Sequence, residues 1–211
     1  MIVYIVYMGF ARKTKALFLD RDGIINELYY DPEYGVIESP LNPTQVRLLF
    51  GIVPLLKAVK KLGYLLIIVS NQPNVALGKT SESNFDRIAK KIIGLLKKEG
   101  VVIDGEYYCF HHPFAKVKKF RKKCDCRKPE PALFLKAAKD HSIDLNSSWM
   151  VGDGVSDIIA GKTAGCKTIL LANIDATENL RIIEQQLGNS KPDYIIKRLT
   201  NAVPIIENLS R

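Results

Sequence analysis

The sequence predicts an α/β protein built on a doubly wound parallel sheet, a Rossmann-like arrangement with helices on both faces. Short apolar runs alternate with longer stretches of helical periodicity along the chain. The runs are apolar at nearly every position, which is typical of strands buried on both faces. The chain has 211 residues and no low-complexity linker, so we expect a single domain over 1–211.

The individual elements follow from where the apolar runs begin and where turn residues interrupt them. We expect strands at residues 15–20, 64–69, 105–109, 148–152, 167–171 and 193–196. We expect helices at residues 52–62, 81–98, 131–141, 156–164, 177–187 and 201–209. Gly63 separates the first helix from the second strand, and Ser81 is a typical N-cap for the long second helix.

The amino-terminal residues 1–10 are apolar, but neither they nor any later run reaches the roughly 18 residues needed to span a bilayer. No basic residue precedes this segment, whereas Arg12, Lys13 and Lys15 follow it, the reverse of a secretory signal. The segment therefore predicts an extra edge strand, or an upstream start with Met8 as the true initiator. We expect a cytoplasmic protein, monomeric and without a membrane partner.

The net charge of +9 is concentrated in one segment of the chain. Residues 114–128 contain eight basic side chains and one acidic one, Asp125. A local positive field of this kind attracts phosphate groups, on a small metabolite or on nucleic acid. The alternative is a solvated basic loop without a partner.

The strongest local motif is Asp20-Arg21-Asp22-Gly23, directly after the first expected strand. A carboxylate at the end of a buried strand is held rigidly and can act as a nucleophile. A second acid two residues later returns to the same place if the chain turns tightly, which Gly23 permits. It can then exchange protons with a leaving group and with water. The alternative is a solvated acidic turn or a helix N-cap.

Further polar side chains end two other expected strands. Ser70 and Asn71 follow the second strand, and Asp153 follows the fourth. Ligands of open α/β sheets bind beyond the carboxyl ends of the strands, so these groups should converge with Asp20 and Asp22. Clustered carboxylates repel one another unless a cation lies among them, and oxygen ligands suit Mg²⁺.

Three of the four cysteines lie close together in the sequence. Cys109 and His111 are separated by twelve residues from Cys124 and Cys126, so that three thiolates and one imidazole are available. This set can fill the tetrahedral shell of Zn²⁺ and leaves no open position, which predicts a structural zinc in a loop over 109–126. The alternatives are a redox pair of Cys124 and Cys126, or unrelated thiols.

Four motifs in this order resemble the haloacid dehalogenase superfamily: Asp20-Arg21-Asp22-Gly23, Ser70-Asn71-Gln72, Arg127-Lys128-Pro129 and Gly152-Asp153 with Asp157. The resemblance implies a fold of that type and a phosphatase that forms a phospho-aspartate. It makes Asp20 the nucleophile and Asp22 the acid/base, with Ser70 binding the phosphoryl group and Lys128 neutralising it. Mg²⁺ would be held by Asp20, Asp153 and the carbonyl of Asp22, with Asp157 in support.

The cysteine loop narrows the resemblance. Its spacing and the following Arg127-Lys128-Pro129 resemble the D-glycero-D-manno-heptose 1,7-bisphosphate phosphatases, and, with a shorter spacer, the histidinol-phosphate phosphatases. The heptose enzymes imply no large cap domain and a substrate-binding role for Arg127. We place Asn71 and Gln72 beside it as substrate-binding residues. The stretch between Asp22 and Gly51 is too short for a cap, although residues 29–37 could form a substrate-facing loop.

Several positions depart from the pattern of the heptose enzymes. Ile24 stands where they usually have Thr, and other substrate-side positions have changed as well, namely Pro73, Asn74, Leu77 and Gly154. The chemical core is retained, so these departures weaken the substrate assignment more than the phosphatase assignment.

Two further functions compete with a small-molecule phosphatase. The basic segment could make the protein a zinc-stapled nucleic-acid-binding module, or a phosphatase of nucleic-acid ends. The segment has few aromatic residues for base stacking beyond Phe114 and Phe120, which disfavours this function. We therefore expect a phosphorylated sugar as substrate, with heptose 1,7-bisphosphate losing its 7-phosphate, and histidinol phosphate or another metabolite as the alternative.

Overall fold

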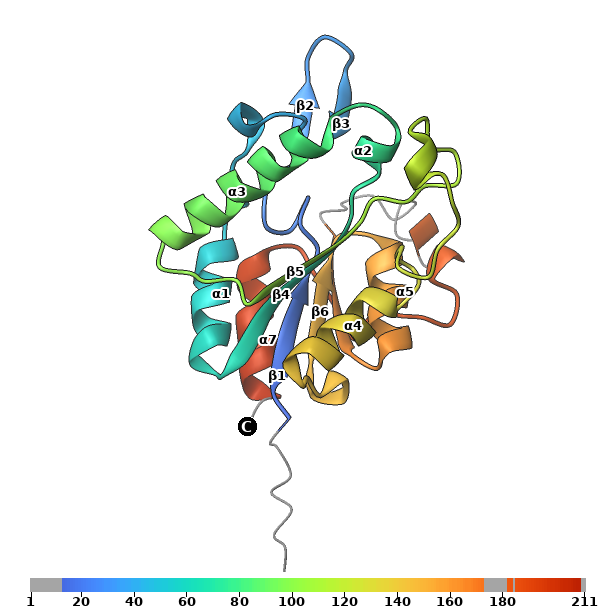
Figure 1. Ribbon diagram of the computed structural model, residues 1–211. Helices are drawn as coiled ribbons and strands as arrows, with labels where there is room; N and C mark the ends of the chain where they lie inside the picture. The colour runs from blue at the N-terminus through green and yellow to red at the C-terminus, as the bar shows by residue number, and fades with distance from the viewer. Residues whose placement is uncertain (1–12, 173–181, 184, 210–211) are drawn as a thin grey trace, which may run out of the picture.

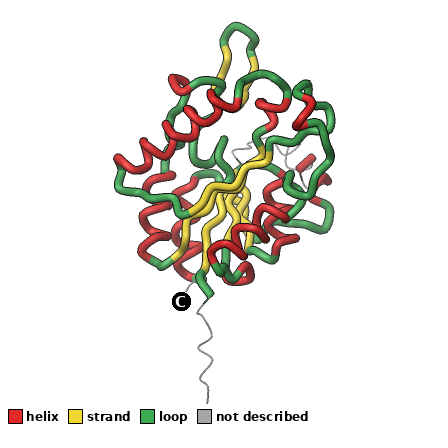
Figure 2. Tube along the Cα trace, viewed as in Figure 1, coloured by secondary structure: helices red, strands yellow, loops and turns green. Residues whose placement is uncertain are grey.

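The computed structural model describes residues 13–172, 182–183 and 185–209, which form one six-stranded sheet flanked by helices. The strand order is β5 (Gly105–Cys109), β4 (Tyr64–Asn71), β1 (Lys15–Leu19), β6 (Trp149–Gly152), β7 (Lys167–Leu171) and β8 (Tyr194–Ile196). Every neighbouring pair in this sheet is parallel. Figure 2 shows the strands as a central layer between helices. The predicted doubly wound α/β fold is confirmed.

Alternate residues of β1 face opposite helical layers. Leu17 and Leu19 pack in one core with α1 (Ile52–Lys61), α3 (Glu82–Lys98) and α7 (Ala202–Asn208). Ala16 and Phe18 pack in the other core with α4 (Ala132–His141) and α5 (Val155–Ala164). All four side chains have no exposed surface. Burial on both faces therefore explains why the strand is apolar at every position rather than at alternate ones.

The element boundaries agree closely with those expected, with one confirmed cap and two differences. The Ser81 side chain accepts a hydrogen bond from the Asn84 amide at 3.1 Å, which confirms it as the N-cap of α3. Strand β4 extends two residues beyond the expected end, so Ser70 and Asn71 lie on the strand itself. The closing helix begins at Ala202, after a short 3-10 turn, η4 (Leu199–Asn201).

Small elements gather at the carboxyl edge of the sheet (Figure 1). An antiparallel hairpin, β2 (Tyr29–Asp31) with β3 (Val36–Glu38), occupies the segment expected to form a loop. The short helix α2 (Pro73–Ala76) follows β4, and an ion pair between Lys79 and Glu38 links this region to the hairpin. Three further 3-10 turns are η1 (Pro43–Gln45), η2 (Lys118–Phe120) and η3 (Leu145–Ser147).

Two expectations concern residues that the structure does not describe. The strand or alternative start at residues 1–10 lies outside the described residues, and so does most of the helix expected at 177–187. Within the described residues, no helix combines the length and apolar character needed to cross a membrane.

Candidate active site

Three carboxylates meet at the carboxyl edge of the sheet, beyond β1 and β6. Asp20 follows β1, and its amide donates a hydrogen bond to Val151 O at 3.1 Å, which ties it to the neighbouring strand. Asp153 follows β6, and Asp157 lies in the first turn of α5. One carboxylate oxygen from each of the three lies within 4.8 Å of the others. The expected convergence of Asp20 and Asp153 is thus present in the structure.

The Lys128 ammonium lies between two of these acids. Its Nζ is 2.6 Å from Asp20 Oδ1 and 2.5 Å from Asp157 Oδ1, and it donates to Val69 O at 2.7 Å. The side chain is buried, with 2% of its surface exposed. Burial alone would lower the pKa of Lys128, but the charges of Asp157 and Asp20 raise it above its ordinary value. Lys128 therefore stays a cation across the physiological range.

Asn71 fixes the backbone that carries Lys128. Its Nδ2 donates to Lys128 O at 2.9 Å, and its Oδ1 accepts from Lys128 N at 3.0 Å. This two-way clamp joins the end of β4 to the loop that contains the lysine. The neighbouring Ser70 is buried, and its hydroxyl accepts a hydrogen bond from Gln72 Nε2 at 3.0 Å.

Asp22 is held by a shell of donors. Arg21 Nη2 lies 2.8 Å from Asp22 Oδ2, Asn26 Nδ2 donates to Oδ1 at 2.9 Å, and Gln72 Nε2 donates to Oδ2 at 2.8 Å. Burial would raise the pKa of Asp22, but the Arg21 charge and these hydrogen bonds lower it below its usual value. The Asp22 carboxylate is thus rigidly oriented and favoured in its ionised form.

Two glycines allow the acids to approach so closely. Gly23 has a φ of 85°, and a Cβ there would lie 2.0 Å from Asp153 Oδ2. A Cβ at Gly152 would lie 2.3 Å from the Asp157 Cβ. A side chain at either position would push a carboxylate out of the cluster, so both motifs require glycine at these positions.

The electrostatics of the cluster favour a bound cation. Burial raises the pKa of Asp20 to about 6, and the charges of Asp157 and Asp22 act in the same direction, against the Lys128 charge. Desolvation by the surrounding protein raises the pKa of Asp153 to about 7, and repulsion from the charges of Asp20 and Asp157 acts in the same direction. The Asp153 side chain still reaches solvent, so a cation can approach it. A divalent ion among these oxygens would remove the repulsion, and the donor set suits Mg²⁺.

Cys109, His111, Cys124 and Cys126 form a second cluster. The three sulfurs lie 3.2 to 3.6 Å apart, and His111 Nδ1 is 3.2 Å from Cys126 Sγ and 3.7 Å from Cys109 Sγ. All four cysteines are free thiols. Ligands about 2.3 Å from a tetrahedral Zn²⁺ lie a little under 4 Å apart, so this set needs only slight expansion to hold the ion.

Arg127, the predicted substrate contact, stands between Cys126 of the cysteine cluster and Lys128 of the carboxylate site, and its side chain is partly buried. Its Nη1 donates to His111 O at 3.3 Å, which connects it to the cysteine cluster. The basic residues at 116, 118, 119 and 121–123 are exposed. Of these, Lys119 pairs with Glu82, and Arg121 Nε donates to Ala115 O at 2.6 Å.

Comparisons with known proteins agree with this geometry. A family profile described as "HAD-hyrolase-like" matches residues 125–202. The D-glycero-beta-D-manno-heptose-1,7-bisphosphate 7-phosphatase of Haemophilus ducreyi is 35% identical over 193 residues, covering 91% of this chain and 98% of that protein. The protein of the same name from Escherichia coli K12 is 37% identical over 161 residues, covering 76% and 80%. The chain belongs to the haloacid dehalogenase-like family of phosphatases.

A solved structure extends the likeness of this phosphatase to three dimensions. The D,D-heptose 1,7-bisphosphate phosphatase of B. bronchiseptica, crystallised with magnesium and phosphate, superposes with a TM-score of 0.72 at 25% identity. The match covers 92% of this chain and 99% of that one. The superfamily and enzyme class expected from the motifs are confirmed, while the individual residue roles remain predictions.

Two residues of the phosphatase site were not predicted from the sequence. Arg21 has 1% of its surface exposed, contacts Asp22 and Gln72, and stacks over the Phe85 ring at 5.2 Å. Asn26 is fully buried and donates to Asp22. The position of Arg21 between two acids in the sequence could have indicated that it pairs with one of them. Nothing local marked Asn26, because its role depends on a turn that returns it to Asp22.

Proposed function

We propose that this phosphatase hydrolyses a phosphorylated sugar through a phospho-aspartate on Asp20, with D-glycero-D-manno-heptose 1,7-bisphosphate as substrate and its 7-phosphate as the group removed. The observation that carries the mechanism is the position of Asp20, within 4.8 Å of Asp153 and Asp157 and paired with Lys128. The substrate is supported by the names of the relatives that match over most of the chain.

In the first half-reaction, Asp20 attacks phosphorus. Lys128 holds Asp20 Oδ1, so we assign the attack to the other oxygen, Oδ2. A bond forms between this oxygen and phosphorus while the bond from phosphorus to the sugar oxygen breaks. Asp22 must carry a proton for this step, against the donors that lower its pKa in the free site, and it gives that proton to the departing sugar oxygen. Ser70 is assigned to hold a phosphoryl oxygen, and the Lys128 charge offsets the negative charge on the group in transfer.

In the second half-reaction, the phospho-aspartate is hydrolysed. Asp22, now ionised, takes a proton from water, and the water oxygen attacks phosphorus as the bond to Asp20 breaks. The donors that lower the pKa of Asp22 favour its ionised form between the two half-reactions, before it accepts this proton. Inorganic phosphate leaves, and both aspartates return to their starting state.

Two metal ions are assigned to the two clusters. Asp20, Asp153 and the carbonyl of Asp22 would hold Mg²⁺, with Asp157 supporting through its contact to Lys128. Mg²⁺ would supply positive charge that stabilises the phosphoryl group in transfer. Cys109, His111, Cys124 and Cys126 would hold Zn²⁺ in a structural role, tethering the loop that leads into Arg127 and Lys128.

The test is phosphate release from heptose 1,7-bisphosphate, histidinol phosphate and a 5′-phosphorylated oligonucleotide, each with Mg²⁺. We expect the bisphosphate to be the preferred substrate, and Asp20→Asn to abolish turnover. Asp86→Asn, a matched change at an exposed position of α3, should keep full activity. Acid-quenched wild-type protein should carry covalent phosphate, and Asp20→Asn should not. Turnover by Asp20→Asn at the wild-type rate would refute the mechanism.

A further inference from the structure

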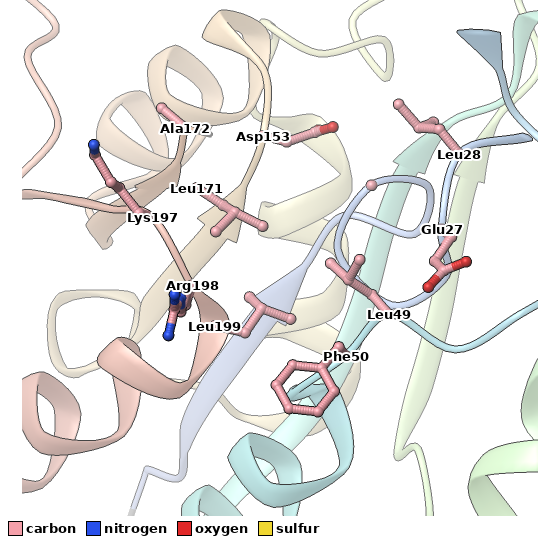
Figure 3. Close-up of a pocket in the computed structure, with 11 residues that line it drawn as sticks. Glu27, Leu28, Leu49, Phe50, Asp153, Leu171, Ala172, Lys197, Arg198 and Leu199 are labelled. Carbon is pink, nitrogen blue, oxygen red and sulfur yellow. The ribbon is translucent and has the colours of Figure 1, made fainter. Parts of the chain in front are cut away.

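A groove of about 560 Å³ lies between helix α3 and strand β5, apart from the cavity of about 470 Å³ beside Asp153 at the catalytic edge (Figure 3). Strand β5 ends the sheet order, so among the described residues only one of its two edges pairs with another strand. Open strand edges pair readily with a further strand, and native proteins usually cover them. Most residues that line the groove are apolar or aromatic: Phe85, Ala89, Ile93, Gly94, Tyr108 and Phe110.

The backbone of β5 can pair with a strand on its open side. Cys109 O accepts a hydrogen bond from Gln72 N at 2.7 Å, so the polar groups of Cys109 face β4. Alternate residues of a strand direct their N–H and C=O groups to opposite sides, so those of Glu106 and Tyr108 point to the open edge. The Tyr108 ring also packs edge-on against Phe85, with 4.9 Å between the centroids. An added strand would therefore gain backbone hydrogen bonds and apolar contacts together.

The chain itself contains a segment with the composition of such a strand. Residues 2–7 read Ile-Val-Tyr-Ile-Val-Tyr, a run of β-branched and aromatic residues, which are the types favoured in strands. They belong to residues 1–12, which lie outside the described residues and lead into β1 through Lys13 and Thr14. Successive residues of a strand face opposite sides, and both alternating sets of this run are apolar or aromatic. Either set can therefore pack against α3.

The distance from β1 to the open edge of β5 suits the length of this segment. The place beyond β5 is three strand spacings from β1, about 14 Å, because only β4 lies between them. Lys15 is in register with Tyr64, and Gly105 with Ile67, so β5 begins about 10 Å further along the sheet. The combined distance of roughly 17 Å takes about six extended residues, which leaves residues 2–7 to lie beside the five residues of β5.

The other open edge of the sheet is a poorer partner for the segment. Strand β8 has three residues, and the place beyond it is four strand spacings from β1, about 19 Å. Both the longer reach and the shorter pairing edge favour β5.

We propose that residues 2–7 form an additional strand along the open edge of β5, with alternate side chains filling the groove against α3. The added strand runs antiparallel to β5, because the chain must return from it to the amino end of β1. The pairing also bears on the catalytic site. The Phe85 ring lies 5.2 Å from Arg21 Cζ, and Arg21 Nη2 lies 2.8 Å from Asp22 Oδ2. A strand packed on Phe85 thus supports the arginine that orients the acid/base residue.

The test is amide hydrogen exchange at Glu106 and Tyr108, followed by NMR in the full chain. We expect both amides to be protected in the wild type. They should exchange at least about tenfold faster in the double variant Tyr4→Asp with Ile5→Asp, which loses the added hydrogen bonds. Because adjacent strand residues face opposite sides, this pair of substitutions places one carboxylate against the groove whichever set faces α3.

Further variants and a reference amide separate local from indirect effects. Ala89→Asp introduces a charge into the groove from α3 and should speed exchange at the same two amides. Combining it with the double variant should speed that exchange no further, because both changes remove one interaction. Leu135→Asp, a matched change at an exposed apolar position of α4, should leave both amides protected. Exchange at Leu17, in a central strand, reports global unfolding, so a change confined to the edge amides identifies lost pairing.

Equal exchange in the wild type and in Tyr4→Asp with Ile5→Asp would overturn the proposal, and so would protection found on the outer amides of β8 instead. A dimeric wild type that loses the protection on dilution would place the segment on a second copy, and would overturn the pairing within one chain. None of these measurements involves phosphate release, so failure of this proposal is distinct from failure of the proposed function.

Discussion

Replacing Lys128 with methionine tests the electrostatic design of the site most directly. Met has a similar length and no charge, so the change removes the cation while largely preserving volume. The Lys128, Asp20 and Asp157 side chains are 2%, 14% and 4% exposed, so the two acids would lose their partner in a poorly solvated place.

The expected loss of stability follows from that burial. Removing one partner of a buried ion pair costs about 3–5 kcal/mol, because the remaining charge stays desolvated. Here one cation serves two acids, so we expect Lys128→Met to lose at least about 3 kcal/mol of unfolding free energy in magnesium-free buffer. For a chain of this size that corresponds to a decrease in Tm of about 6–12 °C. We also expect kcat to fall at least about 100-fold.

A second variant shows whether the loss of stability in Lys128→Met comes from the unbalanced charge or from altered packing. Asp157→Asn removes one stranded charge, while the amide oxygen can still accept from Gly154 N, now 3.0 Å from Asp157 Oδ2. Lys128→Met with Asp157→Asn should therefore be more stable than Lys128→Met alone by about 1–3 kcal/mol. Both variants should remain inactive.

The assay is urea unfolding of zinc-loaded protein without magnesium, followed by phosphate-release kinetics with magnesium. Destabilisation below 1 kcal/mol in Lys128→Met would refute the charge-balance reasoning, and so would a double variant less stable than the single one. Wild-type kcat in either variant would show that Lys128 does not neutralise the phosphoryl group.

Three other outcomes are expected. The pKa values of Asp20 and Asp153 are raised to about 6 and about 7, so the magnesium-free folded state binds more protons than the unfolded state, and its stability falls as the pH rises from about 4 to 7. Thermal melts should therefore show a larger stabilisation by Mg²⁺ at about pH 8 than at about pH 5, and equal shifts in Tm would contradict the cation site. Cys124→Ser should lose bound zinc by elemental analysis and lower the Tm, whereas Cys166→Ala, a buried thiol outside the cluster, should keep its zinc. Burial would raise the pKa of Asp193, but its hydrogen bonds and the Lys162 charge lower it, so Asp193 stabilises the fold above its unfolded pKa near 3.9, and this stabilisation is lost as the pH falls through the folded value. Asp193→Asn should lower the unfolding free energy by about 1 kcal/mol near pH 7, and an equal loss in acid would disprove the linkage.

Much of the fold could be predicted because the relevant signals are local. Strand β5 and strand β7 have the expected bounds, since short runs rich in aromatic or branched residues and bordered by turn residues indicate strands. The hairpin β2–β3 was not predicted, because Tyr30, Tyr34 and Ile37 are exposed and show no alternation of buried and polar positions. Short elements held by their neighbours rather than by a core leave little periodic signal.

The members of the site were predictable for a different reason. The acids follow strands whose carboxyl ends share one edge, so identifying the strands located Asp20 and Asp153 together. The spacing of Cys109, Cys124 and Cys126 likewise indicated a common cluster. What each neighbour contacts was not predictable. Asn71 and Gln72, expected to bind substrate, hold the Lys128 backbone and Asp22, and these contacts depend on packing between distant segments.

The amino-acid sequence by itself determined the α/β architecture and the chemical types that gather at one edge, because hydrophobic period and motif spacing are properties of short stretches. Only the tertiary structure decided that Lys128 bridges Asp20, 108 residues away, and Asp157, and that residues at the carboxyl ends of β1, β6, β7 and β8 line a cavity beside them. Such arrangements depend on how buried surfaces and charges from distant segments pack together in three dimensions, and no single stretch of sequence specifies that packing.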